Sequence, residues 1–537
     1  MNLNIKNNIE IIIYKFFKLI LVVVLRRSGD VLPLYLLRKL DNNLIDNFAK
    51  DINLMNIPVI IITGTNGKTT TTNLIASGLN NAGIRVCSNV NGANMTNGIF
   101  GSILGCYSFN GKFNSDIIVI ETDEKVFPYV ISKINPNIIV ITNFYRDQLD
   151  RYGEVNTTML NIKNSIKSLK TYPVLILPSN EPLASFVGFN TKNKKFYFNF
   201  KSIKILSDNS DNIFIEGSVK KISGGTALID AISCPQCGSI LAAYFSDKYA
   251  IINYCCNSCG YKSNTSDIEA EILEDDYLNF SFHNAEEFAS KIKSNNISDK
   301  QNNLNKNCLI NNNNNNNDND NDKSNCTIDS INNYIINNNI NGNFSFKPSI
   351  QGYYNVLNYM AAFLALKYYG LNDETIRISF ENYLTKFGRS FKKTFKGIEC
   401  SVDLVKNPSG FNNVLEKIFE KNYYYINALF AFSDRDADGR DVSWIWDVNF
   451  EKYIDKFNNI IIAGLRPYDM AIRLKTAGID AKKIKINYNT RKAFYEIINI
   501  SNNNDAHNNN ANDVQKLSRV YIFSTYTELS NLEKIIV

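Results

Sequence analysis

The sequence predicts an α/β protein with a parallel sheet in its first large domain, an inserted four-cysteine ribbon, and a second, Rossmann-like α/β domain at the C-terminus. Two observations support this fold class. Apolar runs of strand length alternate with helical stretches over most of the 537 residues. Two Cys-x-x-Cys pairs interrupt the alternation, which resumes after a long asparagine-rich tract.

The first 50 residues are predicted to form an N-terminal helical segment. Residues 11–25 (IIIYKFFKLILVVVL) are apolar but contain Lys15 and Lys18. This run is shorter than the roughly 20 residues that span a bilayer, and it has no small-residue cleavage site. We interpret it as an amphipathic helix packed on the domain. A role at a membrane surface or in targeting is the alternative.

The central domain is expected over residues 51–390 and the C-terminal domain over residues 391–537. Predicted strands of the two domains are 59–63, 117–121, 138–142, 174–177, 428–432, 459–463 and 520–523. Residues 292–342 and 501–514 are rich in asparagine. Such polar tracts cannot bury enough apolar area to offset chain entropy, so we expect both to be disordered inserts.

The bulk composition narrows the function classes. A net charge of +6 and a pI near 8.5 suit an anionic substrate or an anionic membrane surface, and are not a nucleic-acid signature by themselves. The sequence holds only two histidines, His283 and His507. A mechanism that needs a histidine base is therefore hard to complete within this chain.

The stretch Val59–Leu74 (VIIITGTNGKTTTTNL) reads as a buried strand, a phosphate-binding loop and the start of a helix. It lacks the first glycine of G-x-x-x-x-G-K-[ST], because Ile62 stands six residues before Lys68. Backbone N–H groups of such a loop face phosphate oxygens, the lysine adds charge, and Thr69 offers a hydroxyl to Mg²⁺. An ordinary strand–turn–helix is the alternative. The nucleotide-binding candidates are Gly64, Thr65, Asn66, Gly67, Lys68, Thr69 and Thr70.

The segment TGTNGKTTT (Thr63–Thr71) resembles the ATP loop of the Mur ligase superfamily, whose members join amino acids to carboxylates through an acyl phosphate. Glu121, in ETDE (Glu121–Glu124), matches the position of that superfamily's Mg²⁺ ligand. The segment NFYRDQLDRYGE (Asn143–Glu154) lies where other Mur ligases carry histidines, and has none. It resembles the branch of MurT-type ligase subunits.

Three further segments resemble the superfamily in the same order along the chain. GYYNVLNYMAA resembles the part that contacts adenine, which makes Asn355 and Asn358 candidates. FGRS resembles an FGR-E element, with Ser390 in place of glutamate and Arg389 as a γ-phosphate contact. DLVKNPSGFN resembles the ribose-binding element, with Asp403 as the sugar ligand and Lys406 near phosphate.

The cysteine ribbon, residues 230–264, is predicted from spacing alone. Cys234 and Cys237 are separated from Cys256 and Cys259 by 18 residues, which is typical of a four-thiolate zinc site. Four thiolates leave no open position for a substrate, so the zinc is expected to be structural. Cys255 could compete with Cys256, although the spacing favours Cys256.

The stretch SDRDADGRDVSWIWDVNFE (Ser433–Glu451) holds five aspartates between Asp434 and Asp447 and both tryptophans of the chain. Composition alone favours an acidic loop with the tryptophans as core anchors. The stretch also resembles the MurT-type C-terminal domain. That resemblance implies an aspartate lent to a catalytic triad whose cysteine and histidine lie on a GatD-type class I glutaminase. Asp441 is the first candidate and Asp438 the second.

The resemblance implies a glutamine-dependent ligase that amidates the D-glutamate α-carboxylate of lipid-linked peptidoglycan precursor. ATP, Mg²⁺ and structural Zn²⁺ are the implied cofactors, and Lys68 offsets charge on the reacting phosphate. The expected setting is cytoplasmic, at the inner face of the membrane, in a heterodimer and without nucleic acid. The alternatives are another Mur ligase, adding an amino acid to a nucleotide-linked peptide or folate, and a non-enzymatic zinc-ribbon scaffold or nucleic-acid binder.

Overall fold

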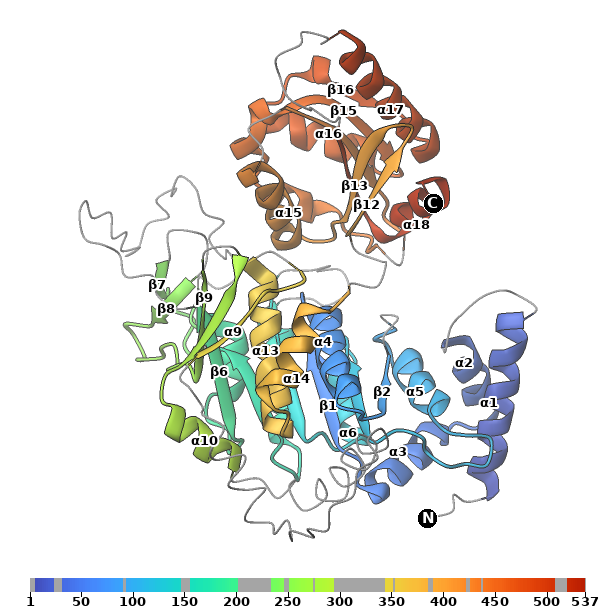
Figure 1. Cartoon of the computed structure of the whole chain (residues 1–537), viewed down its shortest axis with the longest axis vertical. Coiled ribbons are helices and arrows are strands. Elements are labelled where there is room, and N and C mark those ends of the chain that lie inside the picture. Colours follow the sequence, from blue (N-terminus) through green and yellow to red (C-terminus); the bar gives the residue numbers. More distant parts are fainter. Residues whose placement is uncertain are drawn as a thin grey trace, which may run out of the picture. The chain divides into compact units, whose positions relative to one another are not determined.

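The computed structural model describes most of the chain, and its residues form two compact units (Figure 1). The described ranges are 5–23, 31–89, 93–145, 155–200, 233–245, 251–273, 276–293, 343–350, 353–384, 390–421, 425–435, 438–507 and 519–536. The first unit holds the phosphate loop, and the main part of the second begins at Thr385.

The first unit is built on a nine-stranded sheet in the order β11-β10-β9-β6-β5-β4-β1-β3-β2. The seven strands from β9 to β2 pair in parallel, whereas β10 and β11 form an antiparallel edge. The predicted parallel sheet is therefore confirmed for these seven strands, and the antiparallel edge extends it. The strands are β1 (Val59–Thr63), β2 (Val86–Ser88), β3 (Ile117–Glu121), β4 (Ile138–Ile141), β5 (Val174–Pro178), β6 (Lys195–Phe200), β9 (Ile268–Ile272), β10 (Leu278–Phe282) and β11 (Asn343–Phe346).

Helices α4, α13 and α14 lie against one face of this sheet (Figure 1). Strands β1, β3, β4 and β5 are buried along their whole length, as expected when both faces of a parallel sheet are covered. The helices are α1 (Ile5–Val23), α2 (Val31–Leu40), α3 (Leu44–Met55), α4 (Lys68–Asn81), α5 (Thr96–Gly105), α6 (Phe127–Lys133), α8 (Val155–Lys167), α9 (Pro182–Gly188), α10 (Ala285–Lys293), α13 (Tyr353–Tyr369) and α14 (Asp373–Glu381).

The N-terminal segment is helical, but its predicted end at residue 50 falls inside α3. The apolar positions Phe48 and Ile52 of this helix are both buried, so the helix continues until its core-facing stripe ends. Asn56, in the left-handed conformation, then terminates it. The first helix, α1, packs against α2 and α5, as the amphipathic interpretation expected.

The second unit contains a six-stranded sheet in the order β12-β13-β17-β14-β15-β16, parallel except for the β12–β13 pair. Its strands are β12 (Ser390–Phe395), β13 (Ile398–Leu404), β14 (Ile426–Phe432), β15 (Phe457–Gly464), β16 (Ile484–Ile486) and β17 (Arg519–Ser524). Its helices are α15 (Pro408–Lys421), α16 (Pro467–Thr476), α17 (Thr490–His507), α18 (Tyr526–Ile536) and the 3₁₀ turns η3 (Ser443–Asp447), η4 (Phe450–Lys456) and η5 (Ala481–Lys483).

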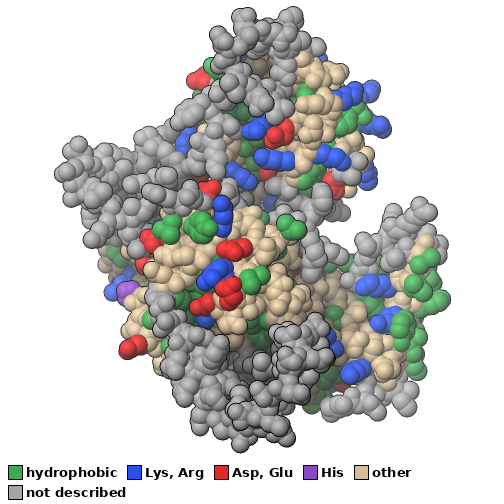
Figure 2. Space-filling view, viewed as in Figure 1, with side chains coloured by type: hydrophobic (Ala, Val, Ile, Leu, Met, Phe, Trp, Pro, Cys, Tyr) green, Lys and Arg blue, Asp and Glu red, His purple; other side chains and the backbone are tan. Residues whose placement is uncertain are grey.

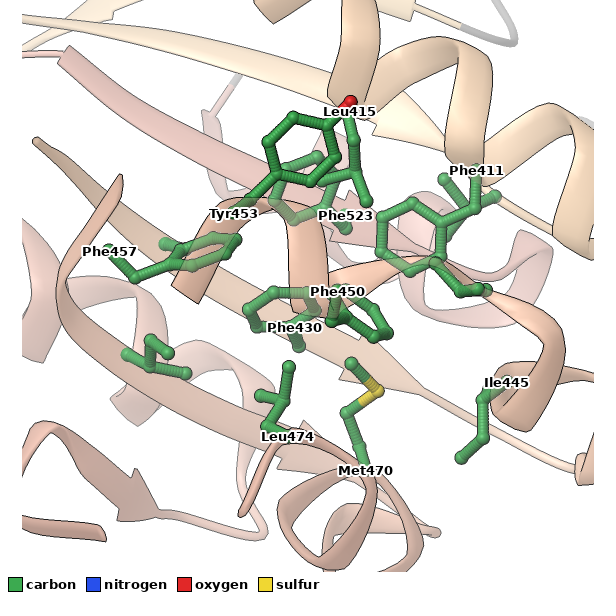
Figure 3. Packing of buried hydrophobic residues seen from close by; sticks show 14 of the residues in the cluster. Phe411, Leu415, Phe430, Ile445, Phe450, Tyr453, Phe457, Met470, Leu474 and Phe523 are labelled. Carbon is green, nitrogen blue, oxygen red and sulfur yellow. The ribbon is translucent and has the colours of Figure 1, made fainter. Parts of the chain in front are cut away.

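Side chains of this second sheet alternate between two cores, which makes it a three-layer structure. On β14, Phe430 and Phe432 enter the core formed with α15 and α16, whereas Leu429 and Ala431 enter the core formed with α17 and α18. Figure 3 shows the first core, in which Phe411, Phe430, Phe450 and Phe523 lie close together. This arrangement confirms the predicted second α/β domain.

The structure tests the prediction of disordered inserts for only one of the two asparagine-rich tracts. Residues 294–342 lie outside the described part of the chain. Residues 501–507, predicted to be disordered, continue α17. Ser501 is buried and accepts a hydrogen bond from Asn427 Nδ2 at 2.9 Å, so a tertiary contact extends the helix into the polar tract.

Candidate functional site

The phosphate loop joins β1 to α4. The order in which strands are added to the sheet reverses at this place, because β1 lies between β3 and β4. Crevices at such points are where α/β proteins bind nucleotides. Gly64 has φ +124° and a Cβ there would overlap Thr142 Oγ1 and the backbone of Asn143. The Thr65 amide donates to the Asn143 carbonyl at 2.9 Å. The first loop glycine is therefore required by close packing on the end of β4.

The Asn143 side chain holds the loop from the other side. Its Oδ1 accepts the Asn66 amide at 2.8 Å, and its Nδ2 donates to the Asn66 carbonyl at 3.1 Å. From the sequence, this asparagine was recognised only as the first residue of a segment without histidines. The signal that indicates its role is its position two residues after the end of β4, the strand that pairs with β1.

Lys68 is buried, and its Nζ donates to the Gly64 carbonyl at 2.5 Å and the Thr65 carbonyl at 3.2 Å. The same Nζ forms an ion pair with Glu124 Oε2 at 3.1 Å. The ε-ammonium is thus held over its own loop, where it can meet phosphate oxygens. Thr69 and Thr70 follow, half-buried, in the first turn of α4. Glu124 is a site residue that the sequence reasoning did not assign.

Glu121 ends β3 beside the loop strand and is almost completely buried. Its backbone N–H donates to Asn89 Oδ1 at 2.9 Å, and its carbonyl accepts from Asn89 Nδ2 at 2.8 Å. Among the described residues, its Oε2 has no hydrogen-bond partner. A buried carboxylate oxygen that lacks a donor is costly unless a cation joins it. The residues present therefore fit the predicted Mg²⁺ ligand.

Asn355 and Asn358 lie one turn apart on α13 and are both buried. Asn358 Nδ2 donates to Asn355 Oδ1 at 3.2 Å, and Thr71 Oγ1 of α4 donates to Asn358 Oδ1 at 3.3 Å. A Cβ on Gly67, which has φ +86°, would overlap Asn358 Oδ1. Asn358 thus contacts α4, the helix that follows the loop, and Asn355 is hydrogen-bonded to Asn358. Their predicted adenine contact stays a prediction.

Two turns with the same hydrogen-bond pattern bring the four predicted cysteines together. Their Sγ atoms all lie within 4.8 Å of one another. Gly238 N donates to the Cys234 carbonyl at 2.8 Å, and Gly260 N donates to the Cys256 carbonyl at 2.9 Å. Cys255 is not in this group. Four clustered sulfurs on paired turns suit a tetrahedral zinc ion that contributes folding energy.

The ribbon is attached to helix α9 through Tyr261, two residues after the last cysteine of the group. Its hydroxyl donates to the Pro182 carbonyl at 2.8 Å, and its ring packs edge-on against Phe186. The ribbon also contains the two-stranded sheet of β7 (Ala242–Phe245) and β8 (Ile251–Cys255). This attachment supports a structural role for the site.

In the acidic loop of the second unit the two candidate aspartates differ in environment. Asp438 is buried, and its Oδ1 accepts the Thr527 amide at 2.9 Å, in the first turn of α18. Asp441 is half-buried and accepts the Ser443 amide at 2.8 Å. Asp438 therefore joins the acidic loop to α18, whereas Asp441 accepts a hydrogen bond within its own loop. Which of the two aspartates completes a triad stays a prediction.

A buried arginine holds the segment that follows these aspartates. Arg473 of α16 donates to the carbonyls of Ile445 at 3.2 Å and Val448 at 2.5 Å, and pairs with Glu451 at 2.8 Å. Trp444 enters the core, but Trp446 is 48% exposed. The interpretation of both tryptophans as core anchors is therefore wrong for Trp446.

Asp403 lies near the end of β13 in the second unit, and its Oδ2 accepts from Ser401 Oγ at 3.3 Å. Lys406 follows the same strand. Arg389 and residues 146–154 lie outside the described part of the chain. The ribose and γ-phosphate roles of Asp403 and Arg389 stay predictions.

Solved structures support the fold. A pseudomurein peptide ligase type C from Methanothermus fervidus superimposes with a TM-score of 0.56 at 17% identity, covering 91% of this chain and 81% of that one. The folylpolyglutamate synthase of Mycobacterium tuberculosis, complexed with ADP and AMPPCP, gives 0.51 at 10% identity, covering 95% and 99%. At these identities the likeness concerns fold alone.

Family models match two separate parts of the chain. The Mur ligase middle domain matches residues 62–232, and the MurT ligase C-terminal domain matches residues 404–529. The chain belongs to the MurT branch of the Mur ligases. A MurT subunit of a lipid II isoglutaminyl synthase (glutamine-hydrolyzing) from Streptococcus pneumoniae is 28% identical, covering 95% of this chain and 92% of the relative. Its Staphylococcus aureus counterpart is 29% identical, covering 84% of each.

Membership of this MurT branch agrees with the features described above. Mur ligases use ATP with Mg²⁺, and the loop, Lys68 and the unpartnered carboxylate oxygen of Glu121 suit both. The resemblance recognised in the short motifs is thereby confirmed at the level of the whole chain, from the middle domain to the C-terminal domain.

Proposed function

We propose that this chain amidates the α-carboxylate of D-glutamate in a lipid-linked peptidoglycan precursor, using ATP and ammonia supplied by a glutaminase subunit. The observation that carries the proposal is the cluster of Lys68, Glu121 and Glu124 at the ends of β1 and β3. It lies in a chain whose similar relatives, matched over most of their length, are named subunits of lipid II isoglutaminyl synthase.

The chemistry divides between the nucleotide and the chain's own groups. The substrate carboxylate attacks the γ-phosphate of ATP, which gives an acyl phosphate and ADP. Ammonia then attacks the carbonyl carbon, and phosphate leaves as the D-isoglutamine amide forms. Lys68 and the amides of Gly64–Lys68 stabilise the negative charge on the transferring phosphate.

The ammonium of Lys68 has three donor positions, which the Gly64 carbonyl, the Thr65 carbonyl and Glu124 occupy. In this proposal Lys68 exchanges Glu124 for phosphate when the nucleotide binds. The Glu124 carboxylate is then available to interact with the Mg²⁺ ion that Glu121 would hold. Glu121 would hold Mg²⁺, which neutralises charge on the phosphates when bound. Asn89 positions Glu121 through its backbone and contributes no ligand atom itself in this proposal.

The partner is proposed to be a GatD-type class I glutaminase in a heterodimer. With only His283 and His507 in the sequence, a Cys-His-Asp triad within this chain is not expected. Asp441 would orient the partner's histidine and stabilise its charged form. The half-buried position of Asp441, compared with the internal hydrogen bond of Asp438, supports this choice.

An exposed apolar surface beside the acidic loop supports a subunit contact at this place. Helix α16 packs against η3, which begins two residues after Asp441. Tyr468 and Ile472 lie one turn apart on α16 and are more than half exposed, and Trp446 is nearly so. Aromatic side chains of this kind dominate protein interfaces. The complex is proposed to act in the cytoplasm, at the inner face of the membrane.

The test uses the purified chain with a class I glutaminase, ATP, Mg²⁺ and lipid-linked muropeptide. D-isoglutamine is measured by mass spectrometry with glutamine or with ammonium as the nitrogen source. Asp441→Asn should lower the rate of D-isoglutamine formation at least about a hundredfold with glutamine as nitrogen source, because the triad is incomplete. It should keep turnover with ammonium, and Asp447→Asn in the same loop is the matched control. Equal loss with both donors would reassign Asp441.

The reaction itself has separate contradicting outcomes. If the complex consumes no ATP with the muropeptide and either nitrogen donor, the proposed amidation is wrong. If the chain alone couples an amino acid to a nucleotide-linked peptide or to folate, it is one of the amino-acid-adding ligases instead.

A further inference from the structure

Helix α1 has an apolar face that the fold leaves exposed. Its exposed positions recur every three or four residues and therefore lie along one side of the helix. They are Ile9, Ile12, Phe16, Leu19, Ile20 and Val23, with exposed fractions from 36% to 66%. Figure 2 shows hydrophobic side chains gathered along this helix. We call these six residues the outer face of α1.

The opposite face of α1 is fixed to the domain. Ile11 and Tyr14 are completely buried and Leu21 nearly so. Tyr14 donates its hydroxyl to the Gly101 carbonyl of α5 at 2.7 Å, and α1 packs along α2. The helix therefore cannot rotate to bury its outer face without losing this packing. A contiguous exposed apolar patch on a fixed helix marks an interaction site.

Almost all charged residues in the sequences of α1 and α2 are basic. Helices α1 and α2 carry Lys15, Lys18, Arg38 and Lys39, and the single acidic residue in their sequences, Glu10, is buried. Lys15 Nζ lies 4.8 Å from the ring centre of Phe109, which is itself 65% exposed and extends the apolar area. Apolar side chains with flanking lysines, and with no exposed carboxylate among the described residues of α1 and α2, complement an anionic lipid surface.

We propose that the outer face of α1 docks the protein on anionic phospholipid, with the helix in the plane of the membrane. None of the described helices is long and apolar enough to cross a bilayer, so the attachment is peripheral. Its purpose rests on the proposed function, because a lipid-linked substrate stays in the membrane that the enzyme must approach. Phe16 and Leu19, at the middle of the face, enter the acyl boundary.

The experiment is co-sedimentation of the full-length protein with vesicles that contain no peptidoglycan precursor. Vesicles of phosphatidylcholine with an equal part of phosphatidylglycerol should bind the protein, and pure phosphatidylcholine vesicles should bind it less. Phe16→Ser/Leu19→Ser should lower partitioning about tenfold or more, because two apolar side chains no longer enter the lipid. Lys18→Glu should weaken only the anionic component, and added salt should do the same.

Leu54→Ser is the matched control, because Leu54 is 65% exposed on α3 but does not belong to the outer face of α1. This change should not alter partitioning. Amidation of precursor in detergent should persist in Phe16→Ser/Leu19→Ser, which separates docking from catalysis. If the unaltered protein does not bind anionic vesicles, or binds equally after both serine changes, the proposal is wrong. Capture of the glutaminase by the outer face instead of lipid would also overturn it.

Discussion

Lys68 Nζ lies 3.1 Å from Glu124 Oε2, and both side chains are less than a tenth exposed. This ion pair joins the first residue of α4 to the loop that follows β3, 56 positions later in the chain. The lysine is thus neutralised by a carboxylate of the same chain. In the proposed mechanism nucleotide binding exchanges that carboxylate for phosphate, so the pair would link stability to catalysis.

Lys68→Met should reduce amidation about a hundredfold or more, because charge stabilisation at the phosphate is lost. It should also lower the free energy of unfolding by about 3 kcal/mol, since Glu124 is left buried without its partner. The double variant Lys68→Met/Glu124→Gln should recover most of that stability and none of the activity. Urea unfolding and ATP consumption measure the two effects. Full activity in the single variant would exclude Lys68 from the mechanism.

Gly67→Ala should weaken ADP binding about tenfold or more, measured by calorimetry. The added methyl group overlaps Asn358 Oδ1, so either the loop or α13 must move. Gly397→Ala is the matched control, because Gly397 also has positive φ, at +82°, but open space around its Cβ position. Both changes carry the backbone cost of about 1 kcal/mol, and only Gly67→Ala should alter nucleotide affinity. Equal affinity in the two variants would contradict the packing argument.

Much of the site could be predicted from sequence because its residues lie in short contiguous motifs. Lys68 follows a glycine loop and Glu121 ends an apolar run. The same short segments therefore predict both the strands and the candidate site residues. The bounds of β1 and β3 were predicted correctly because every residue of these strands is buried and apolar until the site begins.

The parts that were missed depend on contacts between distant segments. The Asn89 contact with Glu121 and the Asn143 contact with Asn66 join residues 32 and 77 positions apart. Asparagine is so common in this sequence that neither position stands out. The antiparallel edge was missed for a similar reason, because β10 and β11 are separated by the asparagine-rich tract and no short turn marks the pairing.

Cys259→Ser should lower the zinc content from about one per chain to well below that, because one of four thiolates is lost. Cys255→Ser should leave the zinc content unchanged, since Cys255 lies outside the four-sulfur group. Inductively coupled plasma mass spectrometry measures the zinc content of both purified variants. Limited proteolysis should show cleavage between Cys234 and Cys259 only in the first variant. Loss of zinc in Cys255→Ser would assign the fourth ligand to Cys255.

A pH dependence of stability should arise from Lys163, on α8. Burial, together with Lys167 and Lys195, lowers the pKa of Lys163 to about 7. Its Nζ donates to the Phe186 carbonyl at 2.6 Å and lies over the ring of the same residue. Between pH 7 and about 10.5 the unfolded chain binds more protons at this lysine than the folded chain does. The folded protein should therefore gain stability as the pH rises through this range.

Lys163→Met removes this titration and should stabilise the protein on the order of 2 kcal/mol at pH 8, because no charge need be lost on folding. The advantage of the variant should shrink steadily towards pH 10, since the unfolded lysine then also loses its proton. Urea unfolding at a series of pH values measures the difference. Lys170→Met is the control and should leave the pH profile unchanged, because Lys170 is exposed beyond the end of α8 and is not among the charges that lower the pKa of Lys163. A constant difference between Lys163→Met and the unaltered protein at all pH values would show that Lys163 stays charged in the fold.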